Sequence, residues 1–310
     1  MAKAEESGWM NVMVRVGLNA CTHPIEYAKV LIQIGHEPLP AYKSRTIFGK
    51  EKLFYPSIFS YIRHIKARDG FVGCYNGLVP KLSSNIVSGL VFQRVVEIIP
   101  IKDDDRDPDD LSKNEKCIRF VKRTGRETAA RCAAILVSQP LHVIAVRTMA
   151  QFVGQDGAYT NVFTSAVVIY REEGVLGFFA GLIPRILCDI GALWLSNTLV
   201  FCINNYVIED KDVKTYVTGT VKFLASAMWY PLQVVSTCMS VTGSDLVAAQ
   251  PPLMPRYASW TECYSQLKSI GCLKRGSTLL WRTYTGPVLM TLAGAPVVPD
   301  TMLFAKTKLN

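Results

Sequence analysis

Polar and charged side chains recur at a helical spacing within the first long apolar segment, residues 9–35. The members of this stripe are Arg15, Asn19, Thr22, Glu26, Lys29 and Gln33, separated by 4, 3, 4, 3 and 4 residues. An α-helix has about 3.6 residues per turn, so this spacing predicts one continuous polar face about 27 Å long. The chemistry that it indicates is non-covalent, because charged groups inside an apolar segment bind water, polar cargo or each other.

Three later apolar segments carry polar residues of the same kind. They are Arg131 and His142 in 128–153, Arg185, Asp189 and Ser196 in 182–208, and Lys222, Gln233 and Ser236 in 214–241. An ionisable group at the centre of a membrane costs about 2.5–3.5 kcal/mol, so such groups face water or a partner. One interpretation is a wet polar groove that binds a substrate. The other is structural pairing, Glu26 with Lys29 and Arg185 with Asp189, while Arg15 and Lys222 extend to an interface.

Covalent chemistry has no candidate residues in this sequence. It contains no nucleophile elbow, phosphate-binding loop or metal-ligand spacing, its four His are far apart, and none of its nine Cys lies in a C-x-x-C pair. We therefore expect a protein that is not an enzyme and that has no cofactor, metal site or disulfide framework. The net charge of +9 favours anionic lipid surfaces as partners. Without a basic and aromatic binding module, the same charge does not indicate nucleic acid.

Five apolar segments are long enough to span a bilayer, which takes about 20 helical residues. They are residues 9–35, 78–99, 128–153, 182–208 and 214–241. Three shorter amphipathic segments, 56–67, 161–172 and 258–270, are predicted to lie along the membrane interface. Hydrophobic residues make up 49% of the chain and charged residues 19%. This balance favours an all-α membrane protein with a wet interior over a soluble domain.

An internal repeat organises these segments. Prolines lie inside the first, third and fifth of them, at Pro24, Pro140 and Pro231. An acidic-Gly, aromatic-x-Gly-Leu-x-Pro-basic signature follows the first two, with its glycines at Gly70 and Gly77 and again 104 residues later at Gly174 and Gly181. Recurrence at fixed spacing predicts repeated structural units. We expect one transmembrane domain built from repeats at about 8–99, 117–208 and, in degenerate form, 213–310, with an acidic linker at 100–116.

These motifs resemble those of the mitochondrial carrier family. Its hallmark is Pro-x-acid-x-x-basic in each odd-numbered helix and an acid-Gly motif before each even-numbered helix, and the resemblance implies a three-repeat helical bundle. In transporting carriers, three acid–basic pairs form a closed gate. In this chain the six gate positions hold Glu26 and Lys29, then His142 and Ala145, then Gln233 and Ser236. With two of the three pairs lost, the chain is similar to a degenerate branch of the family.

The sixth transmembrane helix of such a bundle is expected to be missing or broken. It would lie in residues 279–298, which contain Pro287 and Pro296 with Gly286 and Gly294 near them. Each proline inside a helix removes a hydrogen bond and costs about 3 kcal/mol. Without this helix, the polar surface becomes a groove that is open sideways to lipid between the first and fifth helices.

The resemblance to the degenerate branch also implies a location and a function. It implies a multi-pass protein of the mitochondrial outer membrane that inserts tail-anchored and other α-helical membrane proteins. The implied partners are these client proteins, membrane lipids and apoptotic regulators. Two other functions stay open from the sequence. One is a lipid scramblase that uses the same groove, and the other is a small-solute mitochondrial carrier that works by alternating access.

Overall fold

The computed structural model describes residues 2–45, 49, 51–101, 112–206, 211–284, 289–290 and 296–297. Its long helices are α1 (Ala2–Ile34), α3 (Leu78–Ile98), α4 (Lys113–Ala150), α6 (Leu182–Tyr206) and α7 (Lys211–Val241). Its shorter helices are α2 (Ile58–Gly73), α5 (Val162–Glu173), η1 (Gly174–Phe179), η2 (Val247–Ala249) and α8 (Trp260–Ser269). The five long helices coincide with the five apolar segments, and α2, α5 and α8 coincide with the three amphipathic ones.

Two of the long helices begin earlier than the apolar pattern predicts. α1 begins at Ala2 rather than at residue 9, and α4 begins at Lys113 rather than at residue 128. At the start of α4, the backbone N–H of Ser112 donates to Glu115 Oε2 at 2.9 Å, half of a capping box that favours helix initiation. The last residues of the predicted acidic linker therefore belong to α4, and its residues 102–111 lie outside the described part of the chain.

The three motif prolines lie inside helices and do not end them. Each of α1, α4 and α7 continues for ten residues beyond its proline and ends at Ile34, Ala150 and Val241. Helices tolerate proline when neighbouring groups satisfy the backbone groups that it frees. The equal length of the three extensions is a structural sign of the internal repeat.

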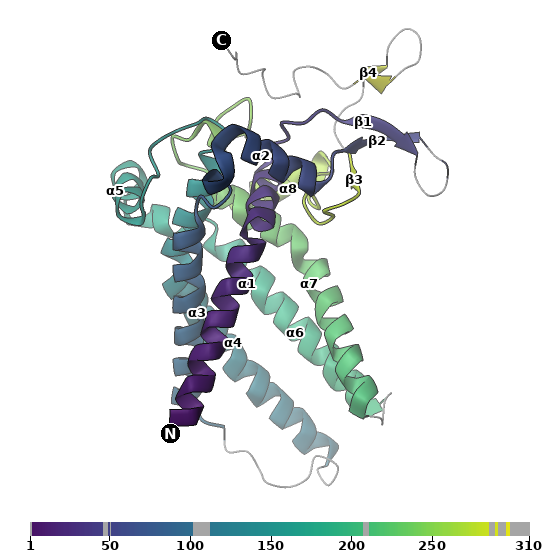
Figure 1. Ribbon diagram of the computed structural model, residues 1–310. Coiled ribbons are helices and arrows are strands. Elements are labelled where there is room, and N and C mark those ends of the chain that lie inside the picture. The colour runs from purple at the N-terminus through teal and green to yellow at the C-terminus, as the bar shows by residue number, and fades with distance from the viewer. Residues whose placement is uncertain are drawn as a thin grey trace.

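The hydrophobic core lies at one end of the bundle. It consists mainly of the segments that follow the prolines in α1, α4 and α7, together with residues of α2, α5 and α8. We call this end of the molecule the closed end. The long helices extend away from it, with α3 packed along α4 and α6 packed along α7 (Figure 1). Buried hydrophobic residues are sparse in the other half of the bundle, so most of the described packing lies at the closed end.

Two helical stretches of the described residues are long and apolar enough to cross a membrane. They are Asn114–Ala150 and Val162–Ile203, with mean hydropathies of 1.5 and 1.8. In the first, 50% of the most apolar window is buried inside the structure, whereas in the second only 6% is. By the same criterion α1, α3 and α7 fall short within the described residues. Five spanning helices therefore remain a prediction.

A small sheet at the closed end contains the start of the region in which the sixth helix was expected. β2 (Glu51–Tyr55) pairs with β1 (Tyr42–Arg45) on one side and with β3 (Arg282–Thr283) on the other, both antiparallel. A second pair joins β4 (Leu289–Met290) to β5 (Pro296–Val297). The described residues of 277–284 contain no helix. Much of 285–298 lies outside the described residues, so the fate of the sixth helix stays a prediction.

Candidate functional site

Three glycines bring the repeat units into close contact at the closed end. A Cβ atom on Gly181 would lie 2.4 Å from the carbonyl oxygen of Ser236 in α7, and its φ of +71° is one that other residues rarely adopt. In the first unit, Gly77 lies in the same way against the Ala145 carbonyl oxygen of α4. In the third unit, Gly276 lies against side chains of α7 and α1. Each unit therefore contacts the next, and the third unit contacts the first.

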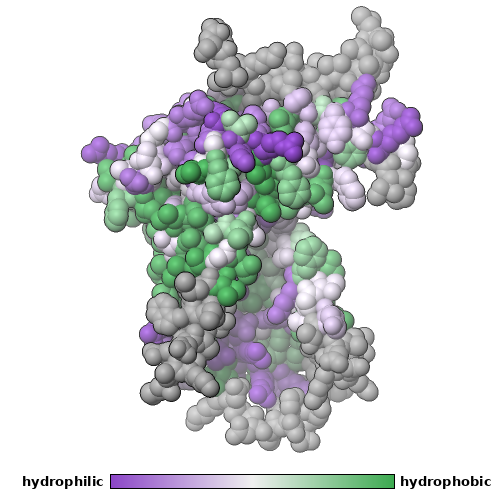
Figure 2. Space-filling view, viewed as in Figure 1, coloured by the Kyte–Doolittle hydropathy of each residue, from purple (hydrophilic) through white to green (hydrophobic). Residues whose placement is uncertain are grey.

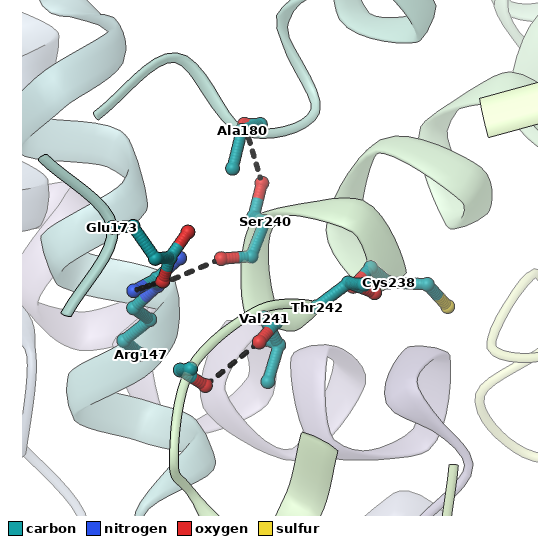
Figure 3. Close-up of polar contacts among 8 residues, drawn as sticks. Arg147, Glu173, Ala180, Cys238, Ser240, Val241 and Thr242 are labelled. Carbon is teal, nitrogen blue, oxygen red and sulfur yellow. Dashed lines mark hydrogen bonds and ion pairs between the residues drawn. The ribbon is translucent and has the colours of Figure 1, made fainter. Parts of the chain in front are cut away.

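A buried arginine reinforces the contact between the second and third units. Arg147 of α4 has no exposed surface. Its Nη1 donates to Glu173 Oε1 at 2.5 Å, and its Nε donates to the Ser240 carbonyl oxygen of α7 at 2.9 Å. The Ser240 hydroxyl donates in turn to the Ala180 carbonyl oxygen at 3.4 Å, and Figure 3 shows these residues converging between α4 and α7. A charge buried this deeply requires such partners.

A second polar network joins α1 to α7 and to the third unit. Gln33 is buried, its Nε2 donates to the Tyr230 hydroxyl at 3.0 Å, and its Oε1 accepts from Thr237 at 3.0 Å. Its carbonyl oxygen accepts from Arg275 Nε at 2.5 Å. Gln33 was predicted to line the polar groove. The structure instead gives it a role in holding α1 against α7.

The gate positions of the three units are chemically different from one another. Lys29 Nζ lies 5.1 Å from the centre of the Tyr230 ring, a cation–π contact between α1 and α7. The equivalent positions hold Ala145, which is fully buried, and Ser236, whose hydroxyl donates to the Gly181 carbonyl oxygen at 2.8 Å. Neither of these side chains can take part in an ion pair. The ring of acid–basic pairs that closes a carrier gate therefore cannot form here.

The sequence suggested the ion pairs Glu26–Lys29 and Arg185–Asp189, but neither is among the ion pairs of the described residues. Glu26 pairs instead with Lys81 of α3, with 3.9 Å between Oε2 and Nζ. Arg185 Nη1 donates to Gln139 Oε1 of α4 at 2.7 Å rather than to Asp189. Both basic residues follow the proline of the repeated signature, so Lys81 and Arg185 are equivalent. Lys81 ties α3 to α1, and Arg185 ties α6 to α4.

Charged groups from four helices form a connected set, in which each lies within electrostatic range of at least one other. We call the following residues the polar cluster: Glu26 and Lys29 of α1, Lys81 of α3, Arg131 and His142 of α4, and Arg185 and Asp189 of α6. Four of these side chains are Lys or Arg and two are carboxylates, so the cluster has an excess of positive charge. In an apolar surrounding, such an excess attracts anionic groups more strongly than it would in water.

The space-filling view shows a hollow in the half of the molecule away from the closed end (Figure 2). Hydrophilic residues are visible inside it, between outer surfaces that are apolar or grey. Large apolar side chains are exposed on α6 and α7, among them Leu187 and Leu199 of α6 and Phe223 and Met228 of α7. Exposed apolar side chains on these helices, together with a hydrophilic hollow, are as expected for a membrane protein with a wet interior.

The remaining predicted site residues differ in how accessible they are. Ser196 is buried and donates to the Leu193 carbonyl oxygen of its own helix at 3.0 Å, so it is already satisfied. Asn19 is half-buried, and Lys222 and Gln233 are exposed, so these side chains are accessible. The side chain of Arg15 lies outside the described part of the structure. Arg131 is exposed and lies 5.6 Å from the centre of the Phe92 ring in α3.

Several residues of the closed end were missed from the sequence. Arg147 and Arg275 are the clearest, because each reaches across to the neighbouring repeat unit. For Arg147 a signal was present, since it is an arginine within an otherwise apolar stretch, and such residues are rarely without a function. Arg275 carried no such signal, because it lies in a polar loop between α8 and β3.

Burial shifts the pKa values of several groups at the closed end outside the long helices, among them His36 and Arg282. Burial lowers the pKa of His36 to about 3, and the positive charges of Arg68 and His64 act in the same direction. Burial also lowers the pKa of Arg282 to about 10, while its Nη2 donates to Glu37 and its Nη1 to the Pro56 carbonyl oxygen. Arg282 therefore links β3 to the loop that follows α1.

Neither the geometry nor the chemistry of the described residues indicates a catalytic centre. No group of three or more His, Cys, Asp or Glu within that part of the chain is arranged to hold a metal ion. The polar cluster consists mainly of Lys, Arg and carboxylates, in contacts with an aromatic ring, a side-chain amide oxygen and one another. It is suited to transient electrostatic contacts with a polar or anionic group.

The first two repeat units of this chain match a known protein family. The sequence matches the family described as Mitochondrial carrier protein over residues 11–99 and 122–205, which are the first two units. It is 38% identical to Mitochondrial carrier homolog 2 from Mus musculus, over 87% of this chain and 92% of that protein. It is 34% identical to Mitochondrial carrier homolog 1 from Mus musculus, over 87% of this chain and 75% of that protein.

A more distant relative is a transporter by name. The Mitochondrial 2-oxodicarboxylate carrier from Mus musculus is 26% identical over 53% of this chain and 50% of that protein. The family match, the similarity to both carrier homologs and the repeated Pro and Gly contacts agree with one another. They confirm the family resemblance drawn from the sequence motifs. This chain belongs to the mitochondrial carrier family and is a helical membrane protein of that family.

Proposed function

We propose that this protein is an insertase of the mitochondrial outer membrane for tail-anchored and other α-helical membrane proteins. In this proposal the polar cluster receives the polar tail of a client, and the hydrophobic helix of the client leaves sideways into lipid. No covalent step is required, so the protein acts without enzymatic chemistry. Membrane lipids are the second partner, because the client must exchange protein contacts for lipid contacts.

One observation carries this proposal: the third unit departs from the other two directly after its glycine. α3 begins immediately after Gly77, and α6 begins immediately after Gly181. After Gly276, residues 277–284 form no helix, and they run along β2 instead, where the Tyr284 backbone N–H donates to the Leu53 carbonyl oxygen at 2.9 Å. A bundle that lacks a helix at this position would be open between α1 and α7.

The energetics of such an opening favour a membrane-protein client. Moving a charged group to the bilayer centre costs about 2.5–3.5 kcal/mol on insertion scales. A groove that offers cationic side chains and water lowers this cost for the short polar tail of a client. The apolar helix that precedes the tail gains free energy from lipid contact and needs no such help. An opening that is polar inside and apolar at its rim meets both requirements, because the tail passes through the polar part while the helix contacts lipid at the rim.

The closed end argues against alternating access. A carrier must open to one side at a time, and shifting a two-state equilibrium from 1:99 to 99:1 takes about 5.5 kcal/mol. Half-exposed ion pairs such as Glu26–Lys81 contribute only about 0–1 kcal/mol each. The closed end is held instead by buried contacts, including those of Arg147 and Gln33. Opening it would require these networks to break.

Two other functions remain as candidates. A small-solute carrier is favoured by the relationship to the 2-oxodicarboxylate carrier and by the excess of cations in the polar cluster, which would attract a carboxylate substrate. A lipid scramblase is favoured by the apolar outer faces of α6 and α7 beside a polar interior, because a headgroup could slide along the same path. A role as a docking partner for apoptotic regulators rests on the family resemblance alone.

One reconstitution separates these functions. Purified protein in liposomes is tested in parallel with a radiolabelled tail-anchored client, a fluorescent phospholipid and a panel of nucleotides, carboxylates and amino acids. The proposal expects protease-protected client and no saturable counter-exchange of any small solute. Robust exchange that an inhibitor blocks, without client protection, would replace the insertase with a carrier. Lipid movement without client protection would replace it with a scramblase.

A further inference from the structure

The short helices α2, α5 and α8 at the closed end bury their side chains in the same register. Each buries two residues that lie four apart: Tyr61 and Ile65 in α2, Ser165 and Ile169 in α5, and Cys263 and Leu267 in α8. Residues four apart share one face of a helix, so these pairs define the inner face. The residues two before, two after and five after the first buried position are exposed in all three helices. They form an outer face whose positions are equivalent in the three units.

The chemistry of this outer face differs from one unit to the next. Its residues are Phe59, Arg63 and Lys66 in α2, Phe163, Val167 and Tyr170 in α5, and Thr261, Ser265 and Lys268 in α8. The outer face is therefore aromatic and cationic in α2, apolar in α5 and polar in α8. All three helices bury the same inner face against the bundle, so packing does not account for this difference. A difference in what surrounds each helix does.

The outer face of α5 extends into an exposed apolar surface on η1. Phe163 is 86% exposed, and Val167 and Tyr170 are at least half exposed. In η1, which follows α5 directly, Leu176 is 82% exposed and Val175 is more than half exposed. Contiguous exposed apolar side chains of this kind mark contact with a membrane or with another protein.

The same apolar surface continues into α6, which indicates lipid as its occupant. Val162–Ile203 form one apolar stretch that includes α5, η1 and most of α6. Ile183 and Leu187 of α6 are exposed, and each lies two residues from Arg185, which is about half a turn around the helix. They therefore lie on the side of α6 opposite Arg185 of the polar cluster, where a spanning helix meets lipid. The outer face of α5 is continuous with a surface that lipid already covers.

The polar outer face of α8 also agrees with its place in the fold. α2 leads into α3 and α5 leads into α6, whereas within the described residues α8 is followed by β3 and by no further helix. α8 therefore has no adjoining spanning helix to bring lipid beside it. Burying the hydroxyls of Thr261 and Ser265 and the charge of Lys268 in lipid would cost free energy that exposure to water avoids.

We propose that α5 and η1 are embedded in lipid at the membrane boundary, whereas α8 remains in water. The exposed charges of α5, Arg171 and Glu172, lie in its last turn and outside the apolar face, so they can stay at the level of the headgroups. The protein then sits unevenly in the membrane, deeper at its second unit than at its third. This differs from the expectation from sequence that all three amphipathic segments lie along the interface. It does not depend on the insertase function.

The test uses the full-length protein reconstituted in liposomes, with one fluorescent noncanonical amino acid incorporated at a time. The labelled positions are Phe163 and Val167 in α5 and the equivalent Thr261 and Ser265 in α8. Phospholipids brominated on their acyl chains quench labels within the bilayer, and iodide on both sides of the membrane quenches labels in water. We expect loss of fluorescence with brominated lipid but not with iodide at the α5 positions, and the reverse at the α8 positions.

Two reference positions in the same molecule calibrate the quenching. Leu187 of α6 is the reference for lipid contact, and the exposed Lys52 of β2 is the reference for water. The same quenching pattern in α5 and α8 would overturn the proposal. So would iodide quenching at Phe163 as strong as that at Lys52. Protection of Phe163 from both quenchers would show that another protein covers α5, and would equally refute lipid as the occupant.

Discussion

Glu173→Gln is expected to destabilise the closed end because it leaves the buried charge of Arg147 without its counter-charge. Arg147 is fully buried and lies 2.5 Å from Glu173, whose side chain is only 18% exposed. Neutralising one member of a buried ion pair costs about 3–5 kcal/mol, because the other charge stays buried without compensation. The amide oxygen of Gln still accepts a hydrogen bond from Arg147, so we expect the lower value, about 3 kcal/mol.

The double variant Arg147→Met/Glu173→Gln tests whether the loss of stability comes from the unpaired buried charge or from general damage to the site. Removing both charges leaves no buried charge unpaired, and Met fills part of the volume of Arg. The hydrogen bond from Arg147 to the Ser240 carbonyl oxygen is lost as well, at a cost of about 1 kcal/mol. We therefore expect the double variant to be more stable than Glu173→Gln by about 2 kcal/mol, although it carries one more substitution.

Denaturant unfolding of the purified protein in detergent micelles, followed by tryptophan fluorescence, measures these differences. Glu97→Gln is the matched control, because Glu97 pairs with Arg94 at 3.1 Å but both side chains are more than half exposed. Exposed ion pairs contribute about 0–1 kcal/mol, so this control should unfold close to the wild type. A double variant that is no more stable than Glu173→Gln would refute the buried-charge argument.

Three further predictions concern other parts of the molecule. The folded-state pKa of His36, about 3, lies below the unfolded value of 6.5, so the unfolded state binds more protons between these values and stability falls as pH drops through that range. Denaturant midpoints should show this loss in the wild type, with a flatter profile for His36→Phe. In reconstituted protein, Lys29→Glu should slow insertion of clients with anionic tails by up to about fivefold and Asp189→Lys should accelerate it, while Val30→Ala should have little effect. Cysteine scanning across 279–298 should give accessibility without a helical period, and continuous lipid protection over that range would show that a sixth helix exists.

The sequence by itself determined the number of the long helices and most of their boundaries, although α1 and α4 begin earlier than the apolar pattern predicts. The contrast between apolar segments of about 20 residues and shorter ones of about 12 predicts which helices span the membrane and which lie at its interface, because bilayer thickness sets the length that a spanning helix needs. The repeat could also be predicted from the sequence, because each copy of the signature has a glycine where its backbone lies close to the next unit, as at Gly77 and Gly181. These features depend on local composition and on constraints that act in every membrane protein.

Periodicity placed Gln33, Ser196 and Ser236 on polar faces but did not reveal how those faces are used. The structure buries all three, in contacts to Tyr230, to the Leu193 carbonyl oxygen and to the Gly181 carbonyl oxygen. A helical stripe specifies an angle around the helix axis. It does not specify the depth at which a neighbouring helix approaches that face. Near the closed end the helices converge and Gln33 and Ser236 become structural, whereas farther along the helices Lys222 remains exposed.

Only the tertiary structure decided which residues join the repeat units to one another. Arg147 and Ser240 are 93 residues apart, and Arg275 and Gln33 are 242 residues apart. No local pattern encodes such a pair, because the partner is in each case a backbone carbonyl oxygen that every residue possesses. The pairing of β3 with β2 is of the same kind, since strand pairing depends on which edge lies nearby in the folded chain. Sequence determines the elements of this protein, and the convergence of those elements at the closed end determines their contacts.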